Sequence, residues 1–201
     1  MIRLGRDVRQ TRSLVSELKT RAEQEGDMVI EGYFAVFSRE TELWEGAFEE
    51  ISPEAFNSTL SNDVRCLINH DTRLVLGRSK AGTLELKADN YGLWGSVKIN
   101  PKDTDAVNLY ERVKRGDVDQ CSFGFNIDEE NVSFNDDGTV KWTITKADLH
   151  EVSVVTFPAY EDTGVQARKV EVAQHEQRKI DARKNQLRER LKNGTKTNHA
   201  S

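Results

Sequence analysis

Short apolar runs, rich in β-branched and aromatic residues, recur between turn residues along most of this chain and predict a mainly β fold. The clearest runs are residues 28–37, 64–71 and 149–157, each of strand length and flanked by polar residues. Residues 135–138 read Asn-Asp-Asp-Gly, which is typical of a tight turn. We therefore expect residues 127–134 to pair, as a hairpin, with the segment that follows this turn.

Two helices are expected between the strands. Residues 103–115 have an apolar stripe at helical spacing, with Asp103 or Thr104 as the N-cap and Gly116 after the last turn. Residues 52–60 begin with Ser-Pro-Glu, which is typical of a helix start. The predicted fold class is therefore mainly β with inserted helices (α+β), arranged as a largely antiparallel barrel or sandwich.

Composition divides the chain into three parts. Residues 1–27 are polar and form an N-terminal extension, in which residues 13–25 predict a frayed helix. Residues 28–167 contain the strands and form the folded β domain. Residues 168–201 form a basic tail that is helical or disordered, because they carry few apolar residues for a core.

The net charge of −5 is unevenly distributed along the 201 residues. Residues 168–201 contain ten Lys or Arg and four Asp or Glu, so this part carries +6 and the rest of the chain −11. A basic tail on an acidic body suits docking on an acidic surface or nucleic acid, or folding back on the body. A solvated helix is the simpler explanation for the same charges.

The composition also indicates the cellular compartment and limits which cofactors the chain could bind. No run of about 18 apolar residues occurs, and no apolar segment of a secretory signal follows the N-terminal arginines. Cys66 and Cys121 are the only cysteines, and each lies in an apolar run, where a buried reduced thiol is the common outcome. We expect a reducing cytoplasm. Neither a metal-ligand spacing nor a glycine-rich phosphate loop is present, so no cofactor is predicted.

Residues 119–125 read Asp-Gln-Cys-Ser-Phe-Gly-Phe and predict a strand with two different faces. The residues that would face the core are Cys121, Phe123 and Phe125. Ser122 lies on the other face beside Gly124, whose missing side chain we expect to leave open space for an approaching substrate. Ser122 is thus a candidate nucleophile, although most serines on strands are only polar surface residues.

A serine nucleophile needs a base within hydrogen-bond reach and a third group that orients the base. Only two histidines lie in the strand-rich part, His70 at a strand end and His150 inside an apolar run. If Glu151 is buried, its carboxylate must be paired or protonated. Alternation along the strand does not choose between His150 and Glu151 as the third group, because they point to opposite faces.

Structural explanations compete with this catalytic interpretation. His70 alone is more typical of a hydrogen-bonded histidine at a strand end than of a catalytic base, and Glu151 could equally form a buried ion pair with an arginine. An α/β-hydrolase is disfavoured, because no Gly-x-Ser-x-Gly sequence surrounds a serine.

Several short segments follow one another in a characteristic order and spacing. These are residues 30–37 (Ile-Glu-Gly-Tyr-Phe-Ala-Val-Phe), 50–56, 67–71 (Leu-Ile-Asn-His-Asp), 89–93, 121–125 (Cys-Ser-Phe-Gly-Phe) and 149–159. In this order and spacing the chain resembles the prohead serine proteases of tailed phages (caudoviruses) over residues 29–163.

This resemblance implies an antiparallel β-barrel of the type found in the herpesvirus capsid maturation protease (assemblin). It implies a serine endopeptidase that acts inside the immature capsid, in the host bacterial cytoplasm. Its substrates would be the scaffold protein, or the scaffold-like part of the major capsid protein, and the enzyme itself. The resemblance assigns Ser122 as nucleophile and His70 as base. The third member matches Glu151, and His150 stays open because the herpesvirus enzymes use a second histidine.

Two other functions stay open. In the first, the chain is a non-catalytic capsid-assembly or scaffold module, Ser122 and His70 are ordinary polar residues, and the basic tail is a tether. In the second, it is a serine esterase, which is disfavoured because no small apolar pocket is suggested. The expected partners are the scaffold and major capsid proteins, and a homo-oligomer is compatible with the sequence. We expect neither a membrane nor nucleic acid as partner.

Overall fold

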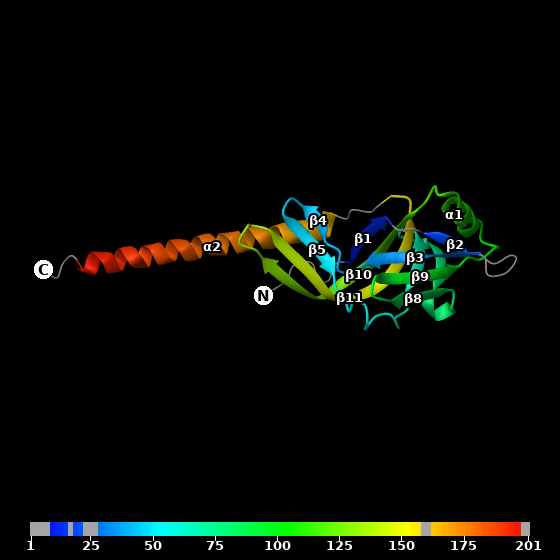
Figure 1. Cartoon of the computed structure of the whole chain (residues 1–201), viewed down its shortest axis with the longest axis horizontal. Helices are drawn as coiled ribbons and strands as arrows, with labels where there is room; N and C mark the ends of the chain where they lie inside the picture. The colour runs from blue at the N-terminus through cyan, green and yellow to red at the C-terminus, as the bar shows by residue number, and fades with distance from the viewer. Residues whose placement is uncertain (1–8, 16–17, 22–27, 158–161, 198–201) are drawn as a thin grey trace. The chain divides into compact units, whose positions relative to one another are not determined.

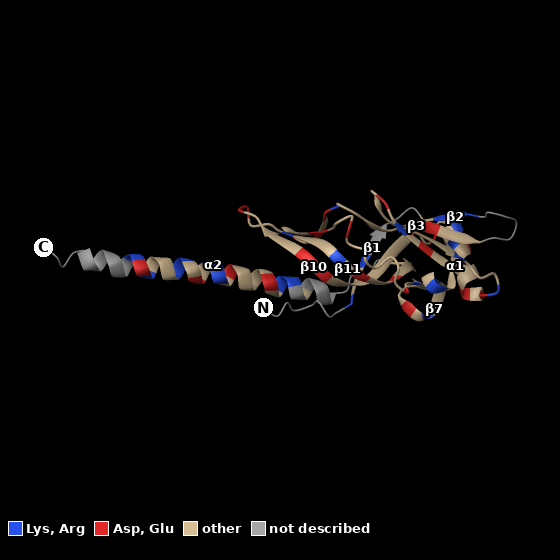
Figure 2. Cartoon of the chain, turned by 90° about the horizontal axis from the view of Figure 1, so that it is seen from below, with Lys and Arg blue, Asp and Glu red and all other residues tan. Residues whose placement is uncertain are grey.

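The computed structural model describes residues 9–15, 18–21, 28–157 and 162–197 (Figure 1). It divides into two compact units, Met1–Glu161 and Asp162–Ser201. The described part of the second unit is the helix α2 (Asp162–Thr197), which carries charged residues of both signs (Figure 2). None of the described helices is long and apolar enough to cross a membrane.

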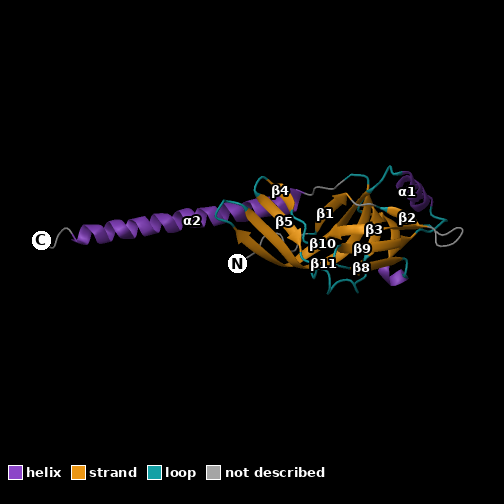
Figure 3. Ribbon diagram, viewed as in Figure 1, coloured by secondary structure: helices purple, strands orange, loops and turns teal. Residues whose placement is uncertain are grey.

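The first unit is dominated by strands (Figure 3). Its larger sheet is built around two long neighbouring strands, β10 (Gln120–Phe134) and β11 (Val140–Val155). They pair antiparallel along their length and are joined by a turn in which Gly138 has a φ of 89°. The predicted hairpin is therefore confirmed. The other strands of this sheet are β1 (Gln10–Val15), β4 (Thr41–Trp44), β5 (Ala47–Ile51), β6 (Arg65–Ile68) and β7 (Asp71–Arg78).

The second sheet has the order β2-β3-β9-β8 and is antiparallel throughout. Its strands are β2 (Lys19–Arg21), β3 (Val29–Val36), β9 (Gly92–Lys98) and β8 (Leu84–Ala88), and the short 3-10 helix η1 (Ser79–Ala81) leads into β8.

The predicted fold class, mainly β with inserted helices, is confirmed. The arrangement of a closed herpesvirus-type barrel is not, because the ladders among the described residues form two sheets. The expectation of antiparallel pairing also holds only in part. β11 pairs in parallel with both β5 and β6, which lie beside different halves of this one long strand.

One of the two predicted helices forms. Helix α1 (Thr104–Arg115) begins after Asp103, whose carboxylate accepts from the N–H groups of Asp105 and Ala106. It ends at Gly116, which has the left-handed conformation of a helix C-terminus, with a φ of 84°. This helix is confirmed as predicted.

The helix predicted over residues 52–60 is wrong, since this segment consists of successive turns. Ser52 does not act as an N-cap. Its hydroxyl donates to the Glu54 carboxylate, and its N–H donates to the carbonyl of Ile144 and extends the ladder of β5. Ala55 and Phe56 are fully buried, so packing in the core decides the path of these turns.

The frayed helix predicted over residues 13–25 is also wrong for the residues that the structure describes there. β1 pairs with β10 in the larger sheet, and β2 pairs with β3 in the second. Each of these segments completes the hydrogen bonds of a neighbouring strand that would otherwise present unpaired N–H and C=O groups. The boundaries proposed at residues 27/28 and 167/168 stay predictions.

The hydrophobic core joins both sheets and α1 in one cluster of buried side chains. It includes Phe34 from β3, Leu93 from β9, Phe123 from β10 and Leu109 from α1. Cys66 and Cys121 also belong to it and are fully buried reduced thiols, as predicted. This core holds β10 and β11, the strands that carry Ser122 and Glu151.

Candidate active site

Ser122 lies on β10 between two neighbouring strands. Its cross-strand partners are Ser13 on β1 and Ser153 on β11. Its side chain is fully buried, and its hydroxyl donates a hydrogen bond of 2.9 Å to the carbonyl oxygen of Arg12. The expectation of open space over Ser122 is therefore wrong in this structure, because the side chain is fully buried and its hydroxyl contacts the backbone of the neighbouring strand β1.

The space beside Gly124, which was predicted to admit a substrate, is occupied by another side chain. It faces Glu151 across the β10–β11 ladder. A Cβ atom on Gly124 would lie 2.3 Å from Glu151 Oε1 and 2.7 Å from Arg9 Nε. The missing side chain thus makes room for the Glu151 carboxylate rather than for a substrate.

A tight turn between β6 and β7 carries His70. Asn69 and His70 are its two central residues, with φ values of 49° and 60°. Positive φ at both positions is what a type I′ hairpin turn requires, and it costs a residue other than glycine about 1–2 kcal/mol. Asn69 Oδ1 accepts a 2.8 Å hydrogen bond from the Thr156 N–H, which fastens the turn beside the end of β11. The backbone thus holds the imidazole at a fixed place.

His70 and Glu151, which are 81 residues apart in the chain, meet at this place. His70 Nδ1 lies 2.7 Å from Glu151 Oε1. Ser153 donates a 2.6 Å hydrogen bond to the other oxygen, Oε2, and Arg9 Nη2 lies 2.8 Å from Oε1. The Glu151 carboxylate is 2% exposed and therefore depends on these partners for its charge.

The charge state of Glu151 follows from this balance. Burial by itself raises the pKa of Glu151, but the hydrogen bond and charge of His70, the Ser153 hydroxyl and the charge of Arg9 outweigh it. The pKa of Glu151 is therefore below its ordinary value, and the group is a carboxylate at neutral pH. When the imidazole is neutral, a carboxylate that accepts from Nδ1 leaves the other ring nitrogen, Nε2, as the proton acceptor.

Ser122 and His70 are not hydrogen-bonded to each other. His70 Nε2 is buried and has no hydrogen-bond partner among the described residues, and the Ser122 hydroxyl is engaged by Arg12. Ser153 links the two regions, since it is the cross-strand partner of Ser122 and its Oγ lies 3.4 Å from His70 Nδ1. The structure thus joins His70 to Glu151 on β11 and places Ser122 on the neighbouring strand β10.

His150, the alternative third residue, faces the other way from Glu151. Its side chain is 37% exposed, and its Nδ1 lies 3.9 Å from Asp148 Oδ2. The contact with the His70 ring is made by Glu151.

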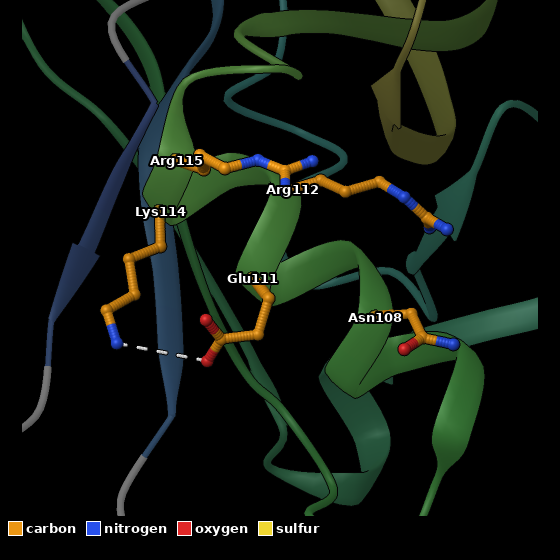
Figure 4. Close-up of a pocket in the computed structure, with 5 residues that line it drawn as sticks. All are labelled: Asn108, Glu111, Arg112, Lys114 and Arg115. Carbon is orange, nitrogen blue, oxygen red and sulfur yellow. Dashed lines mark ion pairs between the residues drawn. The ribbon is translucent and has the colours of Figure 1, made fainter.

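A separate open pocket of about 510 Å³ lies on α1 (Figure 4). Its lining contains no serine, cysteine or histidine, and Lys114 Nζ and Glu111 Oε1 form an ion pair of 3.8 Å within it. The lining residues are Asn108, Glu111, Arg112, Lys114 and Arg115. The pocket includes none of the candidate catalytic residues.

Four residues at or near the site were not predicted from the sequence. Ser153 carried a signal, because it lies two positions from Glu151 on the same strand and shares its face. Arg9 and Arg12 carried none, because the polar sequence around them is typical of an extension to the fold. Glu49 lies on β5 and binds Arg12, which is carried by β1, a strand that the sequence did not predict.

A sequence profile of the caudovirus prohead serine protease family matches residues 16–178, which include Ser122, His70 and Glu151. The chain belongs to this family. The prohead protease of Enterobacteria phage HK97 is 30% identical to it over 145 residues, which are 70% of this chain and 60% of that protein. The chain therefore spans about 60% of the length of this relative.

Among solved structures, the bacteriophage T4 capsid assembly protease, gp21, is similar to this chain with a TM-score of 0.45. The two are 12% identical, and the match covers 75% of this chain and 97% of that one.

Proposed function

We propose that this chain is a serine endopeptidase of capsid maturation, with Ser122 as nucleophile, His70 as general base and Glu151 as the residue that orients the base. The observation that carries the proposal is the 2.7 Å contact between His70 Nδ1 and the buried Glu151 carboxylate. Such a pair fixes the tautomer in which Nε2 accepts a proton, and it occurs here in a chain of the prohead protease family.

The proposed reaction begins when the Ser122 hydroxyl leaves the Arg12 carbonyl and turns toward His70 Nε2. Catalytic hydrogen bonds are often absent in a resting enzyme and form in the substrate complex. His70 takes the proton while Ser122 Oγ attacks a peptide carbonyl carbon, and it then protonates the leaving amine. In the second half, His70 takes a proton from a water molecule, which attacks the acyl-enzyme, and His70 then returns the proton to Ser122 Oγ. Glu151 stabilises the imidazolium that forms in both halves.

The proposed substrates are the scaffold protein or the scaffold-like part of the major capsid protein, and the enzyme itself. The proposed place of action is the interior of the immature capsid in the host cytoplasm. Family membership supports both, since the family is that of the prohead proteases.

A non-catalytic assembly module is the second candidate, and one observation favours it. Ser122 is fully buried and already hydrogen-bonded to the backbone, as a structural serine would be. Under this alternative, the His70–Glu151 contact is an ion pair that holds the β6–β7 turn against β11.

A processing assay separates the two functions. The purified full chain is mixed with the scaffold and major capsid precursors of the phage that encodes it, and shortened products are followed by mass spectrometry. We expect Ser122→Ala and His70→Ala to lower the rate by about 10⁴–10⁶-fold while circular dichroism shows an intact fold. Ser133→Ala, at an exposed serine of the same strand, is the matched control and leaves the rate unchanged. If Ser122→Ala still processes the precursors, Ser122 is not the nucleophile.

A further inference from the structure

The strand β1 lies where an extended peptide substrate would pair with β10. Its register is antiparallel, with Arg12 opposite Phe123 and Ser13 opposite Ser122. The carbonyl in contact with the Ser122 hydroxyl is that of Arg12, at 2.9 Å. Proteins commonly bind extended peptides by adding them as a strand to a sheet, with side-chain pockets providing the specificity. The peptide bond next to Ser122 is therefore the bond between Arg12 and Ser13.

The side chain of Arg12 occupies a charged site. Its Nε lies 2.5 Å and its Nη2 2.9 Å from the two carboxylate oxygens of Glu49 on β5. Glu49 is 3% exposed with this arginine in place. Gln10 Oε1 accepts a 2.8 Å hydrogen bond from the same Nη2, and the guanidinium lies 5.8 Å from the centre of the Phe125 ring.

This site has the chemistry that selects a cation. A two-oxygen contact with a guanidinium is among the strongest charge-assisted hydrogen bonds, and a carboxylate buried to this degree requires a positive partner. A neutral or acidic side chain in the same place would lose this two-oxygen contact with Glu49.

We propose that Glu49 determines substrate specificity: it binds the side chain of the residue whose carbonyl Ser122 attacks and selects Arg or Lys there, and β1 is the enzyme's own substrate strand, cleaved between Arg12 and Ser13. This inference rests on the proposed function, because it needs Ser122 to be the nucleophile.

The self-cleavage step follows the reaction given above. Ser122 Oγ forms an ester bond with the Arg12 carbonyl carbon as the bond from that carbon to the Ser13 nitrogen breaks. The Ser122 proton passes through His70 to this nitrogen, which becomes the new N-terminus. Water then attacks the ester, which leaves the Arg12 carboxylate and restores the Ser122 hydroxyl. Removal of the strand ending at Arg12 frees the edge of β10 and the Glu49 site for substrates in trans.

The competing explanation is a structural ion pair that fastens β1 permanently to the sheet. Both explanations predict that a change at Glu49 lowers stability. Only the specificity explanation predicts that Glu49 sets which residue precedes the cleaved bond.

The experiment measures cleavage position and charge preference on the full chain. Intact-mass analysis and N-terminal sequencing follow the wild type and Ser122→Ala over time. Peptides that copy residues 7–18, with Arg, Lys, Gln or Glu at the position of Arg12, are then offered in trans to the wild type, Glu49→Gln and Glu50→Gln. Glu50 is the matched control, because it lies beside Glu49 on β5 and contacts Lys141 and Thr143 instead.

We expect a new N-terminus at Ser13 in the wild type and none in Ser122→Ala. We also expect kcat/KM to be about 10²-fold higher for Arg than for Gln, as loss of one partner from a buried charge pair implies. Glu49→Gln removes this preference, whereas Glu50→Gln keeps it. If Glu49→Gln does not fold, the inference is tested by the wild type alone, through its preference for Arg or Lys over Gln and Glu at the position of Arg12.

Two results would overturn the inference in distinguishable ways. Ser122-dependent cleavage without preference for a basic residue, or with a preference unchanged in Glu49→Gln, removes the role of Glu49 and leaves the proposed function standing. Absence of any Ser122-dependent cleavage, of peptides or of capsid precursors, removes both.

Discussion

Gly124 and Glu151 face each other across the β10–β11 ladder with no room for a side chain on Gly124. The nearest atoms to a Cβ there would be Glu151 Oε1 at 2.3 Å and two nitrogens of Arg9 at 2.7 and 2.9 Å. All three atoms are ends of long side chains, so a methyl group would displace the carboxylate rather than the backbone. This glycine therefore sets the position of the group that holds His70.

Gly124→Ala is expected to impair catalysis more than folding. The displaced carboxylate loses its 2.7 Å contact with His70 Nδ1, so we expect kcat/KM to fall by about 10²-fold or more. The overpacking itself should cost about 1–3 kcal/mol of unfolding free energy. Cleavage rates and urea unfolding on the same preparation measure the two effects.

Gly138→Ala is the control for this prediction. Gly138 lies in the β10–β11 turn at a φ of 89° with no atom within 4 Å of a Cβ, so alanine there is strained but touches nothing. We expect a stability cost of about 1 kcal/mol and an unchanged rate per folded molecule. Equal losses of activity in the two variants would contradict the steric role of Gly124.

Glu151→Gln and His150→Gln distinguish the two candidates for the residue that orients His70. Glutamine at Glu151 cannot stabilise an imidazolium, and we expect kcat to fall by about 10²–10⁴-fold. His150 is partly exposed and contacts Asp148, so His150→Gln should leave kcat within twofold. A larger loss in His150→Gln than in Glu151→Gln would reverse the assignment.

The pH dependence of stability gives an independent check on Glu151. Its pKa in the folded state is lowered, so the folded protein holds the carboxylate more tightly ionised than the unfolded chain does. The resulting stabilisation is complete above the unfolded value of about 4.3 and is lost as the pH falls through the lower folded value. The Tm difference between wild type and Glu151→Gln should therefore narrow below about pH 4.

Local patterns predicted the elements whose causes are local. Helix α1 forms where Asp103 caps it and Gly116 ends it, and the β10–β11 hairpin forms at the turn with Gly138. The alternation of apolar and polar residues alone predicted which face of the Ser122 strand lies in the core, and Cys121 is buried on that face as expected.

The predictions that were wrong concern segments whose structure depends on residues far away in the sequence. β1 is a strand because it completes the edge of β10, more than 100 residues later in the chain, and nothing in its own polar sequence reveals that edge. Residues 52–60 contain a helix-start sequence, but tertiary burial of Phe56 overrides it. The covering of Ser122 and the role of Gly124 were missed for the same reason, since both depend on which strands become neighbours.

The two cysteines should be unreactive in the folded protein. Both side chains are fully buried, and burial, with smaller contributions from Cys121 and Glu151, raises the pKa of the Cys66 thiol well above its ordinary value. We expect iodoacetamide at pH 8 to label neither thiol and to leave activity intact, and to label both in guanidinium chloride. Mass spectrometry counts the labels. Inhibition that tracks labelling of Cys121 would point to a thiol rather than Ser122 as the reactive group.

Asp63 holds together the hairpin that presents His70. Arg65 and Arg78 face each other across the β6–β7 ladder, where like charges repel. The Asp63 carboxylate accepts hydrogen bonds of 2.7 and 2.5 Å from Arg78 and of 3.2 Å from Arg65. The hydrogen bond from Arg78 is the main cause that lowers the pKa of Asp63 to about 2.

Asp63→Asn should therefore lower the Tm at neutral pH and loosen the His70 turn. Because the folded pKa lies below the unfolded one, the contribution of Asp63 is complete above about pH 4 and disappears as the pH falls through about 2. Thermal unfolding from pH 7 to pH 2 should show the curves of variant and wild type converging at the acid end. Glu85→Gln is the matched control, since Glu85 pairs with Lys87 on the exposed face of one strand and bridges no repelling pair. A Tm loss in Asp63→Asn no larger than in Glu85→Gln would show that the turn holds His70 without this carboxylate.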